Sequence, residues 1–346
     1  MSLDAALQRL WYGPRWKSLP LWPLGALFRG AVALRSGLYR AGLLRAQHLP
    51  VPVVVVGNIN VGGTGKTPVA AWLARQLGLR GHRVGVVLRG YGGRARAAPR
   101  VVRTDSDPAD VGDEALLHAL RGPQVVVVGA DRVAAARLAV EQGAGVIVCD
   151  DGLQHLRLGR DCEIAVVDAV RGVGNGLLLP AGPLREPKSR LESVDAVVFT
   201  QRGTTAQPSL AVRNPMSLTM RFDLGDAVNL RTGERRPLDA FRGRPVHAVA
   251  GIGNPGAFFE ALRSAGLELQ AHALPDHAAL RRDSLPFPSG ATVLMTEKDA
   301  VKCRSCADGD WWFVELEAHL DRTATDELLA MILGRAGLTG AGVRLG

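Results

Sequence analysis

Short apolar runs alternate with stretches of helical periodicity from residue 51 to about residue 200. Near-continuous Val and Ile runs are typical of strands buried on both faces, in a parallel sheet that helices cover. Strands are therefore predicted at residues 53–56, 84–88, 124–128, 146–149, 164–167 and 196–199, with helices near 66–79, 112–120 and 132–142. We expect residues 51–205 to form an α/β domain with a doubly wound, mostly parallel sheet, which binds its ligands at the carboxyl ends of the strands.

A second alternation follows the polar stretch QRGTTAQPS, which begins at Gln201. It predicts strands at residues 217–222, 247–249, 267–271, 292–295 and 312–314, and helices near 255–265 and 325–335. We expect residues 206–346 to form a second, smaller α/β domain that contributes to the cleft. Its last helix can pack back on the first domain.

The first 50 residues differ from both domains. Seven basic residues and one acid lie there, so most of the net charge of +9 is in this segment, with three of the six tryptophans. If residues 21–40 are helical, Leu24, Leu27, Phe28, Ala31, Leu34 and Leu38 share one side, interrupted by Arg35, and Arg29 and Arg40 lie opposite. This pattern predicts an amphipathic helix in a membrane interface. The alternatives are a helix packed on its own domain and a nucleic-acid-binding segment, although no recognition motif accompanies the charge.

Composition limits the class of protein further. With 47% apolar and 22% charged residues, the chain can bury sizeable cores, which excludes a mostly disordered chain. Four cysteines in 346 residues are too few for a disulfide scaffold and indicate a reducing compartment. The uncharged run at residues 18–28 is too short to cross a bilayer, and the N-terminus lacks the features of a secretory signal.

A glycine-rich loop follows the first predicted strand and opens the first predicted helix, in the sequence VGNINVGGTGKTP at residues 56–68. Backbone N–H groups of residues 62–65 (Gly62, Gly63, Thr64 and Gly65) can hold phosphate oxygens. Lys66 can reach the β- and γ-phosphates, and the Thr67 hydroxyl can hold Mg²⁺. The pattern departs from G-x-x-x-x-G-K-[ST] because Asn60 stands at its first glycine. We expect a nucleoside triphosphate site here rather than a merely flexible turn.

Carboxylates at strand and helix ends are candidates for the rest of this site. Asp150 and Asp151 follow the predicted strand at 146–149, where one can hold the metal while the other orients a loop or takes part in proton transfer. Asp113 and Glu114 begin a predicted helix, a place where acids are also common because they suit the helix dipole.

Three further features belong to loops and to the second domain. Asp276 and His277 could pair a carboxylate with an imidazole. The Gly- and Pro-rich stretch 171–187 indicates a shaped loop for an acceptor substrate. Cys303 and Cys306 have metal-like spacing, but no second pair or histidine partner lies nearby in the sequence, so no zinc site is expected.

Taken in order, these stretches resemble the lipid A 4′-kinase family, the tetraacyldisaccharide 4′-kinases of Gram-negative bacteria. The matching stretches are VGNINVGGTGKTP (56–68), RGYGG (89–93), VGDE (111–114), DDGLQHLRLGRD (150–161), GNGLLLPAGPLRE (174–186), GIGNP (251–255), PDH (275–277) and MTEKDAVK (295–302), which together extend over nearly the whole chain. Two positions depart from the family's pattern. Leu88 stands where Ser often precedes RGYGG, and Ala278 stands where a second His often follows.

The resemblance implies a P-loop NTPase-like fold and phosphorylation, dependent on ATP and Mg²⁺, of the 4′-hydroxyl of an acylated glucosamine disaccharide 1-phosphate. The product would be a bis-phosphorylated lipid A precursor, lipid IVA. The resemblance also implies a peripheral position on the cytoplasmic face of the bacterial inner membrane, where residues 1–50 contact anionic inner-leaflet lipids. Basic residues there could also contact the acceptor's 1-phosphate. We expect a monomer with no nucleic-acid partner.

The resemblance also suggests a role for each candidate residue. Asp113 is the expected general base, His277 orients it, and Asp150 and Asp151 are the rival bases. Lys66 acts on the transferred phosphate, and Asn60 and residues 62–67 bind the nucleotide. The expected metal ligands are Thr67, Asp150 and Glu114.

Two other functions share the phosphate loop. The first is a nucleotide-dependent switch or metallochaperone-like GTPase, but the Asn-Lys-x-Asp segment that typically reads guanine does not occur in the sequence. The second is a soluble small-molecule kinase, which would need no membrane surface.

Overall fold

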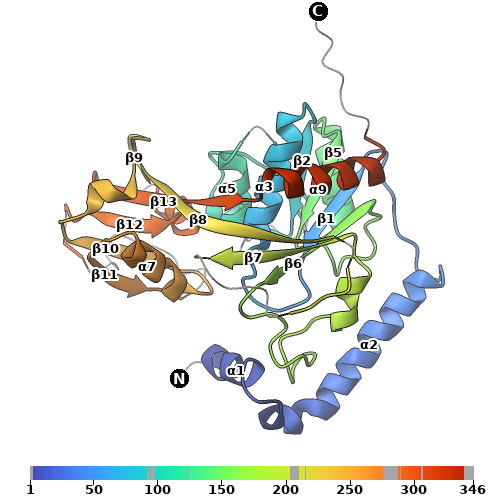
Figure 1. The fold of residues 1–346 in the computed structure, drawn as a ribbon. Helices are drawn as coiled ribbons and strands as arrows, with labels where there is room; N and C mark the ends of the chain where they lie inside the picture. The colour runs from blue at the N-terminus through green and yellow to red at the C-terminus, as the bar shows by residue number, and fades with distance from the viewer. Residues whose placement is uncertain are drawn as a thin grey trace, which may run out of the picture.

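The described residues form one 13-stranded sheet that runs through the molecule (Figure 1). The computed structural model describes residues 3–91, 93, 98–122, 124–202, 210–214, 216–275, 287–288, 290–304 and 307–338. Across the sheet the strand order is β11-β10-β12-β13-β8-β7-β6-β1-β5-β2-β4-β3, and β9 pairs with β8.

The described elements have the following bounds. The strands are β1 (Val53–Gly57), β2 (Val84–Leu88), β3 (Arg100–Val102), β4 (Val125–Val128), β5 (Val146–Asp150), β6 (Cys162–Asp168), β7 (Ala196–Arg202), β8 (Ser217–Asn229), β9 (Arg235–Arg236), β10 (Val246–Ala250), β11 (Leu269–Ala273), β12 (Val293–Thr296) and β13 (Trp311–His319). The α-helices are α1 (Leu3–Trp11), α2 (Trp22–Arg40), α3 (Lys66–Leu79), α4 (Pro108–Val111), α5 (Asp113–Leu120), α6 (Arg132–Glu141), α7 (Pro255–Ser264), α8 (Glu297–Cys303) and α9 (Arg322–Arg335). The 3₁₀ helices are η1 (Arg15–Leu21), η2 (Lys188–Glu192) and η3 (Leu238–Phe241).

The central strand β1 explains why the apolar runs are continuous. It lies between β5 and β6 and pairs with both in parallel. Because side chains alternate along a strand, Val54 and Val56 pack into one core and Val53 and Val55 into the other. Helices α3, α5 and α9 supply buried side chains to the first core, and α6 supplies them to the second. The predicted doubly wound α/β fold is confirmed, and its parallel strands bring their carboxyl ends to one edge.

The long strand β8 connects the two halves of the sheet. Residues 217–222 pair in parallel with β7, and residues 221–229 pair antiparallel with β13. The strand predicted at 217–222 therefore continues to Asn229. In the second half, α7 packs in one core and α8 in the other.

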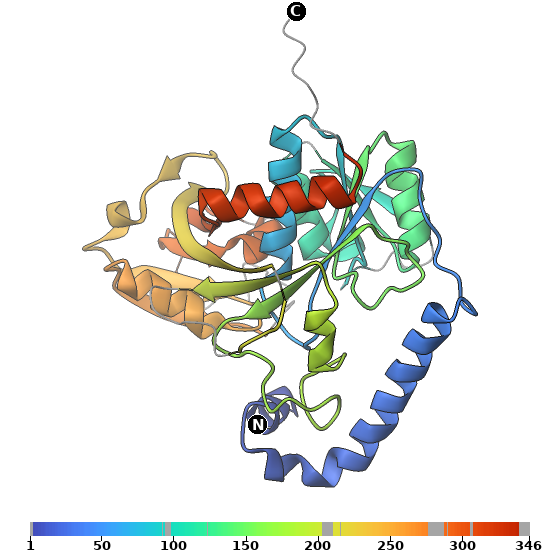
Figure 2. The ribbon, with the colours of Figure 1, turned by 45° about the vertical axis from the view of Figure 1, so that its right-hand side comes forward.

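The N-terminal segment is largely exposed. In both views α2 extends away from the sheet, while α1 lies beside the loops that follow β6 (Figures 1 and 2). Of residues 22–40, all of which the structure describes, Gly25 is the only buried one. Leu27 and Leu34 are 72% and 66% exposed. Within the described part of the chain, no helix is long and apolar enough to cross a membrane. Over most of its length, α2 is therefore not a helix packed on its own domain.

Helix α9 packs against the first half of the molecule. Leu328, Leu329 and Ile332 belong to the same core as Leu73 and Leu77 of α3. Two ion pairs lie at its ends, from Arg80 to Asp326 at 3.5 Å and from Arg335 to Asp195 at 3.0 Å. The last described helix thus stabilises the layer that carries the glycine-rich loop.

We predict that Leu328→Ala lowers the free energy of unfolding by about 2–5 kcal/mol, because it opens a cavity in this buried core. Glu327→Ala, at an exposed position of the same helix, is the matched control and should change stability by less than about 0.5 kcal/mol. Thermal or urea unfolding measures both variants. Equal effects would contradict the packing of α9 on this core.

Candidate active site

The glycine-rich loop joins β1 to α3. Gly65 caps the helix with a φ of 83°, a left-handed conformation that favours glycine. A Cβ at this position would also lie 2.7 Å from the Phe222 ring. Only glycine therefore fits where the loop enters α3. The N–H groups of the first turn of α3 can donate hydrogen bonds to an anion.

Polar contacts fix the conformation of this loop. Asn58 Nδ2 donates to Thr64 Oγ1 at 2.8 Å, and Thr200 Oγ1 donates to the carbonyl oxygen of Thr64 at 2.8 Å. Asn60, the residue in place of the expected glycine, is buried, and its Nδ2 donates to the carbonyl oxygen of Gly172 at 2.8 Å. The side chain of Asn60 thus ties the glycine-rich loop, called the phosphate loop below, to the loop that follows β6.

Lys66 and Thr67 lie in the first turn of α3. Lys66 Nζ is 3.7 Å from Asp151 Oδ1. The Thr67 hydroxyl has no hydrogen-bond partner within the described residues. Burial acts to raise the pKa of Asp151, but the charges of Lys66 and Arg185 outweigh it and hold that pKa below its usual value. Asp151 is therefore a carboxylate at neutral pH, next to the lysine expected to contact the phosphates.

Arg185 joins the phosphate loop to Asp151, a role the sequence did not predict. Its guanidinium donates to Asn58 Oδ1 at 2.5 Å and to the carbonyl oxygen of Asn60 at 3.0 Å. The same group reaches both oxygens of Asp151, at 3.3 and 3.4 Å. Arg185 lies in the LPAGPLRE stretch, one of those that match the family, and this match was a signal that the residue matters. Its partners lie far away in the sequence, so its contacts could not be predicted.

Asp150 and Asp151 face different surroundings, as expected for adjacent residues at a strand end. Asp151 has a φ of 56°, which turns its backbone away from the strand. Asp150 is buried and its Oδ2 lies 3.3 Å from Nε2 of the buried His118, on α5. Asp150 Oδ1 has no hydrogen-bond partner among the described residues. A buried, unsatisfied carboxylate oxygen beside the phosphate loop fits a cation ligand.

Helix α8 brings two lysines to the acids at the start of α5. Lys302 Nζ lies 3.5 Å from Asp113 Oδ2 and 3.2 Å from Asp299 Oδ1. Lys298 Nζ lies 3.8 Å from Glu114 Oε1. Asp113 is buried, whereas the Glu114 side chain is 42% exposed. The two halves of the chain therefore meet at the predicted base.

The stretch GIGNP and Pro275, the first residue of PDH, lie near the same place. The N–H of Gly251 donates to Asp299 Oδ2 at 2.9 Å. A Cβ on Gly251 would lie 3.2 Å from the carbonyl oxygen of Pro275. Pro275 thus lies beside the Asp299–Lys302–Asp113 cluster. Asp276 and His277 follow it and lie outside the described residues, so the predicted pairing of His277 with Asp113 stays a prediction.

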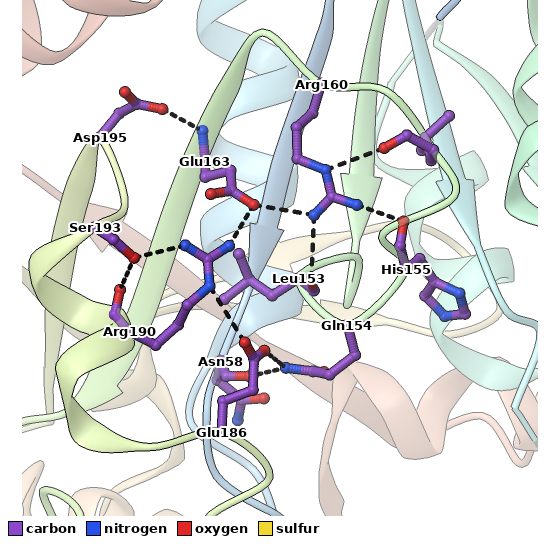
Figure 3. A network of polar contacts seen from close by, with 11 residues as sticks. Asn58, Leu153, Gln154, His155, Arg160, Glu163, Glu186, Arg190, Ser193 and Asp195 are labelled. Atoms are coloured by element: carbon purple, nitrogen blue, oxygen red, sulfur yellow. Dashed lines mark hydrogen bonds and ion pairs between the residues drawn. The ribbon is translucent and has the colours of Figure 1, made fainter. Parts of the chain in front are cut away.

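A network behind the site fixes the loop that follows Asp151 (Figure 3). Arg160 donates to the carbonyl oxygens of Leu153 and His155 and pairs with Glu163. Gln154 Nε2 donates to the Asn58 carbonyl oxygen at 3.0 Å and to Glu186 Oε1 at 2.6 Å. The carboxylate loop and the phosphate loop are therefore held as one unit.

No group of three or more His, Cys, Asp or Glu side chains suited to a metal occurs among the described residues. Mg²⁺ in nucleotide sites usually relies on one or two protein ligands and on substrate phosphates, so this finding fits the predicted site. Cys303 is buried, and Cys306 lies outside the described residues.

Comparison with known proteins gives consistent matches. The family model described as tetraacyldisaccharide-1-P 4′-kinase, LpxK, matches residues 17–334. A tetraacyldisaccharide 4′-kinase of Alkalilimnicola ehrlichii is 49% identical over 322 residues, 93% of this chain and 94% of that protein. One of Nitrosococcus oceani is 46% identical over 330 residues, 95% of each chain. A crystal structure described as the "apo" form of LpxK from Aquifex aeolicus in complex with ATP has a TM-score of 0.79 and 29% identity, and the match covers 92% of this chain and 99% of that one.

His155 provides a test of the charge around the site. Burial, with the nearby Arg132, lowers the pKa of His155 from 6.5 to about 4. Between these values the unfolded chain binds a proton that the folded chain does not, so the free energy of unfolding falls as the pH falls through this window. We predict that, between pH 7 and pH 5, the melting temperature of His155→Gln falls less than that of the unmodified protein. His319→Gln, at a half-exposed histidine on β13, is the control. The same loss in all three proteins would contradict a partly buried, neutral His155.

Proposed function

The chain belongs to the tetraacyldisaccharide-1-phosphate 4′-kinase family, and we propose that it transfers the γ-phosphoryl group of ATP to the 4′-hydroxyl of a tetraacylated glucosamine disaccharide 1-phosphate. The product is the bis-phosphorylated lipid A precursor, lipid IVA. One observation carries the proposal. Lys66, at the end of the glycine-rich loop, lies 3.7 Å from Asp151. Asn60 and Arg185 tie that loop to the predicted acceptor loop, residues 171–187. A GTPase switch would have no use for that acceptor loop.

ATP occupies the loop between β1 and α3 in this proposal. The N–H groups of residues 62–65 bind phosphate oxygens, and Lys66 places its charge on the β- and γ-phosphates. The negative charge of Asp151 holds Lys66 in the site before ATP enters. ATP binding then exchanges one anionic partner of Lys66 for another, so the lysine needs little rearrangement.

Thr67 and Asp150 are the residues that suit Mg²⁺ best, because a hydroxyl and a carboxylate oxygen there lack other partners within the described residues. Glu114, the third predicted ligand, is paired with Lys298 and stays a prediction. When bound, Mg²⁺ supplies positive charge that offsets the charge developing on the transferred phosphoryl group.

In the transfer step, the acceptor oxygen forms a bond to the γ-phosphorus while the bond from that phosphorus to the β–γ bridging oxygen breaks. ADP leaves and the hydroxyl proton goes to a base. We assign that base to Asp113, which Lys302 of the second half contacts at 3.5 Å, with His277 orienting it. Asp151 is the rival, but Lys66 and Arg185 hold it as a weak base.

Residues 1–50 place the enzyme at the membrane in this proposal. The exposed Leu27 and Leu34 of α2, with Trp16 and Trp22 nearby, form an apolar surface that would insert into the interface. The basic residues of the segment favour anionic lipids of the inner leaflet. The enzyme would thus act as a peripheral monomer on the cytoplasmic face of the inner membrane, where acylated acceptor and ATP meet.

We predict that Lys66→Ala abolishes detectable transfer of labelled phosphate from ATP to tetraacyldisaccharide 1-phosphate in detergent, without a change in the melting curve. Thr67→Ala should raise the Mg²⁺ concentration needed for half-maximal rate. Near-normal turnover of folded Lys66→Ala would contradict the assignment of the phosphate loop.

Leu27→Glu should weaken binding to anionic vesicles and slow phosphorylation of vesicle-borne acceptor, since a charge in the interface opposes insertion. Leu79→Glu, at a residue that is 70% exposed at the end of α3, is the matched control. Co-sedimentation with vesicles measures the binding. If both variants lose binding equally, the effect is one of net charge and α2 is not the anchor.

Asp113→Ala and His277→Ala should each lower turnover, by about a hundredfold or more for Asp113, because general-base assistance is worth roughly 10² to 10⁴. If the two residues act as a unit, the double variant loses little beyond the worse single variant. ATP affinity should barely change. Fully multiplicative losses would show that the residues act independently, and a small loss at Asp113 with a near-complete loss at Asp151 would move the base to Asp151.

A further inference from the structure

His118 is a fully buried polar side chain that the mechanism above does not use. It lies in the last turn of α5, and its exposed fraction is 0%. Its Nε2 lies 3.3 Å from Asp150 Oδ2, whereas its Nδ1 has no hydrogen-bond partner among the described residues. Burial of an imidazole costs free energy unless its polar atoms are bonded, so an apolar side chain would pack here at less cost. Packing therefore does not explain His118, and its contact with Asp150 does.

The alternation of side chains along β5 places Asp150 on the face of the sheet that α5 covers. Val146 and Val148 belong to the core to which α3 and α5 contribute, and Asp150 is the next residue of β5 with the same orientation. On α5, Ala115 is buried in that core, and His118 follows three residues later on the same side of the helix. Both side chains therefore lie in the layer between the sheet and the helices that begin at the phosphate loop and at Asp113.

The two oxygens of Asp150 have different surroundings. A carboxylate oxygen only accepts hydrogen bonds, so Nε2 of His118 carries the hydrogen and donates it to Oδ2. Oδ1 is buried and has no partner within the described part of the chain. The backbone of Asp150 is fixed as well, because β5 pairs with β1 and Asp150 lies opposite Val56. With one oxygen held by His118, the carboxylate cannot turn freely, and Oδ1 stays available to a cation.

Contacts of α5 with the rest of the molecule fix the position of His118 without help from Asp150. Gln124 Nε2 donates to the carbonyl oxygen of His118 at 3.1 Å. One turn further along the chain, Arg121 Nε donates to Glu297 Oε1 at 3.1 Å, and a second N–H of the same guanidinium donates to the other oxygen of Glu297. The imidazole is therefore oriented before a metal ion binds.

We propose that His118 is a positioning residue of the metal site, which donates to Asp150 Oδ2 and so presents Oδ1 to the Mg²⁺ that accompanies ATP. The inference rests on the proposed function, in which Asp150 is a Mg²⁺ ligand. Carboxylates that bind a metal are commonly held by a hydrogen bond of this kind, which sets their orientation. In this role His118 acts through Asp150 alone and contacts neither the metal nor a phosphate.

The test measures the affinity of the enzyme–ADP complex for Mn²⁺, a paramagnetic substitute for Mg²⁺, by electron paramagnetic resonance. His118→Phe keeps a ring but removes the donor, and should weaken Mn²⁺ binding about 10- to 100-fold, the usual effect of losing a contact to a metal ligand. His118→Gln, whose amide can donate, should recover part of the loss. The affinity for ADP without metal should not change in either variant.

Leu116→Ala, at a buried apolar position of the same helix, is the matched control. It should lower the melting temperature, because it opens a cavity beside α5, and leave the Mn²⁺ affinity unchanged. A double-mutant cycle adds the second control. If His118 acts through Asp150, His118→Phe should add little to the loss of Mn²⁺ affinity that Asp150→Asn causes alone.

An unchanged Mn²⁺ affinity in folded His118→Phe would overturn the proposal, and so would a loss that adds in full to that of Asp150→Asn. An equal loss in Leu116→Ala would overturn it too, since the effect would then belong to the packing of α5. If Asp150→Asn itself binds Mn²⁺ normally, Asp150 is not a ligand and the inference falls. These measurements need no acceptor lipid. Failure of the unmodified enzyme to phosphorylate tetraacyldisaccharide 1-phosphate would overturn the proposed transfer, while the Mn²⁺ affinities still decide the role of His118.

Discussion

The guanidinium of Arg185 is the contact on which the site depends. It binds Asn58 and Asn60, which follow β1, and both oxygens of Asp151, which follows β5, so residues from the ends of two neighbouring strands share one cation. Without it, Asp151 would have Lys66 as its remaining close cationic partner among the described residues, and the phosphate loop would lose two hydrogen bonds. Because Arg185 belongs to the predicted acceptor loop, its contacts also hold that loop against the glycine-rich loop.

The second half of the chain reaches the same edge through α8. Lys302 and Lys298 contact Asp113 and Glu114, and Arg121 pairs with Glu297 across the α5–α8 contact. The base proposed for proton transfer is therefore positioned by a helix almost 200 residues further along the chain. Any motion of the second half relative to the first would change the surroundings of Asp113 directly.

Periodicity and loop chemistry predicted most of the fold. The helix predicted at 66–79 and the strand at 84–88 coincide with α3 and β2, since a glycine turn and buried Val runs leave little ambiguity. The short edge strand β3 and the seven-residue helix α8 were missed, although Thr296 caps α8 by accepting from the N–H of Asp299. Neither element has enough residues for a periodic pattern to emerge.

The residues of the candidate site that lie within one motif could be predicted from the sequence. The residues that contact them from distant parts of the chain could not. Lys66, Thr67 and the strand-end acids were found because their neighbours in sequence define their geometry. Arg185, His118 and Lys302 were not assigned, because each acts on a residue that is 30 or more positions away. Asn60 shows the same limit. It stands where the motif has a glycine, and only the structure reveals that its side chain donates a hydrogen bond to the carbonyl oxygen of Gly172.

Arg185 and Asp151 together hold the glycine-rich loop and Lys66 in place. A double-mutant cycle with Arg185→Met and Asp151→Asn, read as kcat/KM for ATP at fixed acceptor, tests it most directly. We expect each single variant to be strongly impaired and the double variant to be little worse than the worse single variant. Losses that multiply would contradict it, because they would mean that the two side chains contribute independently.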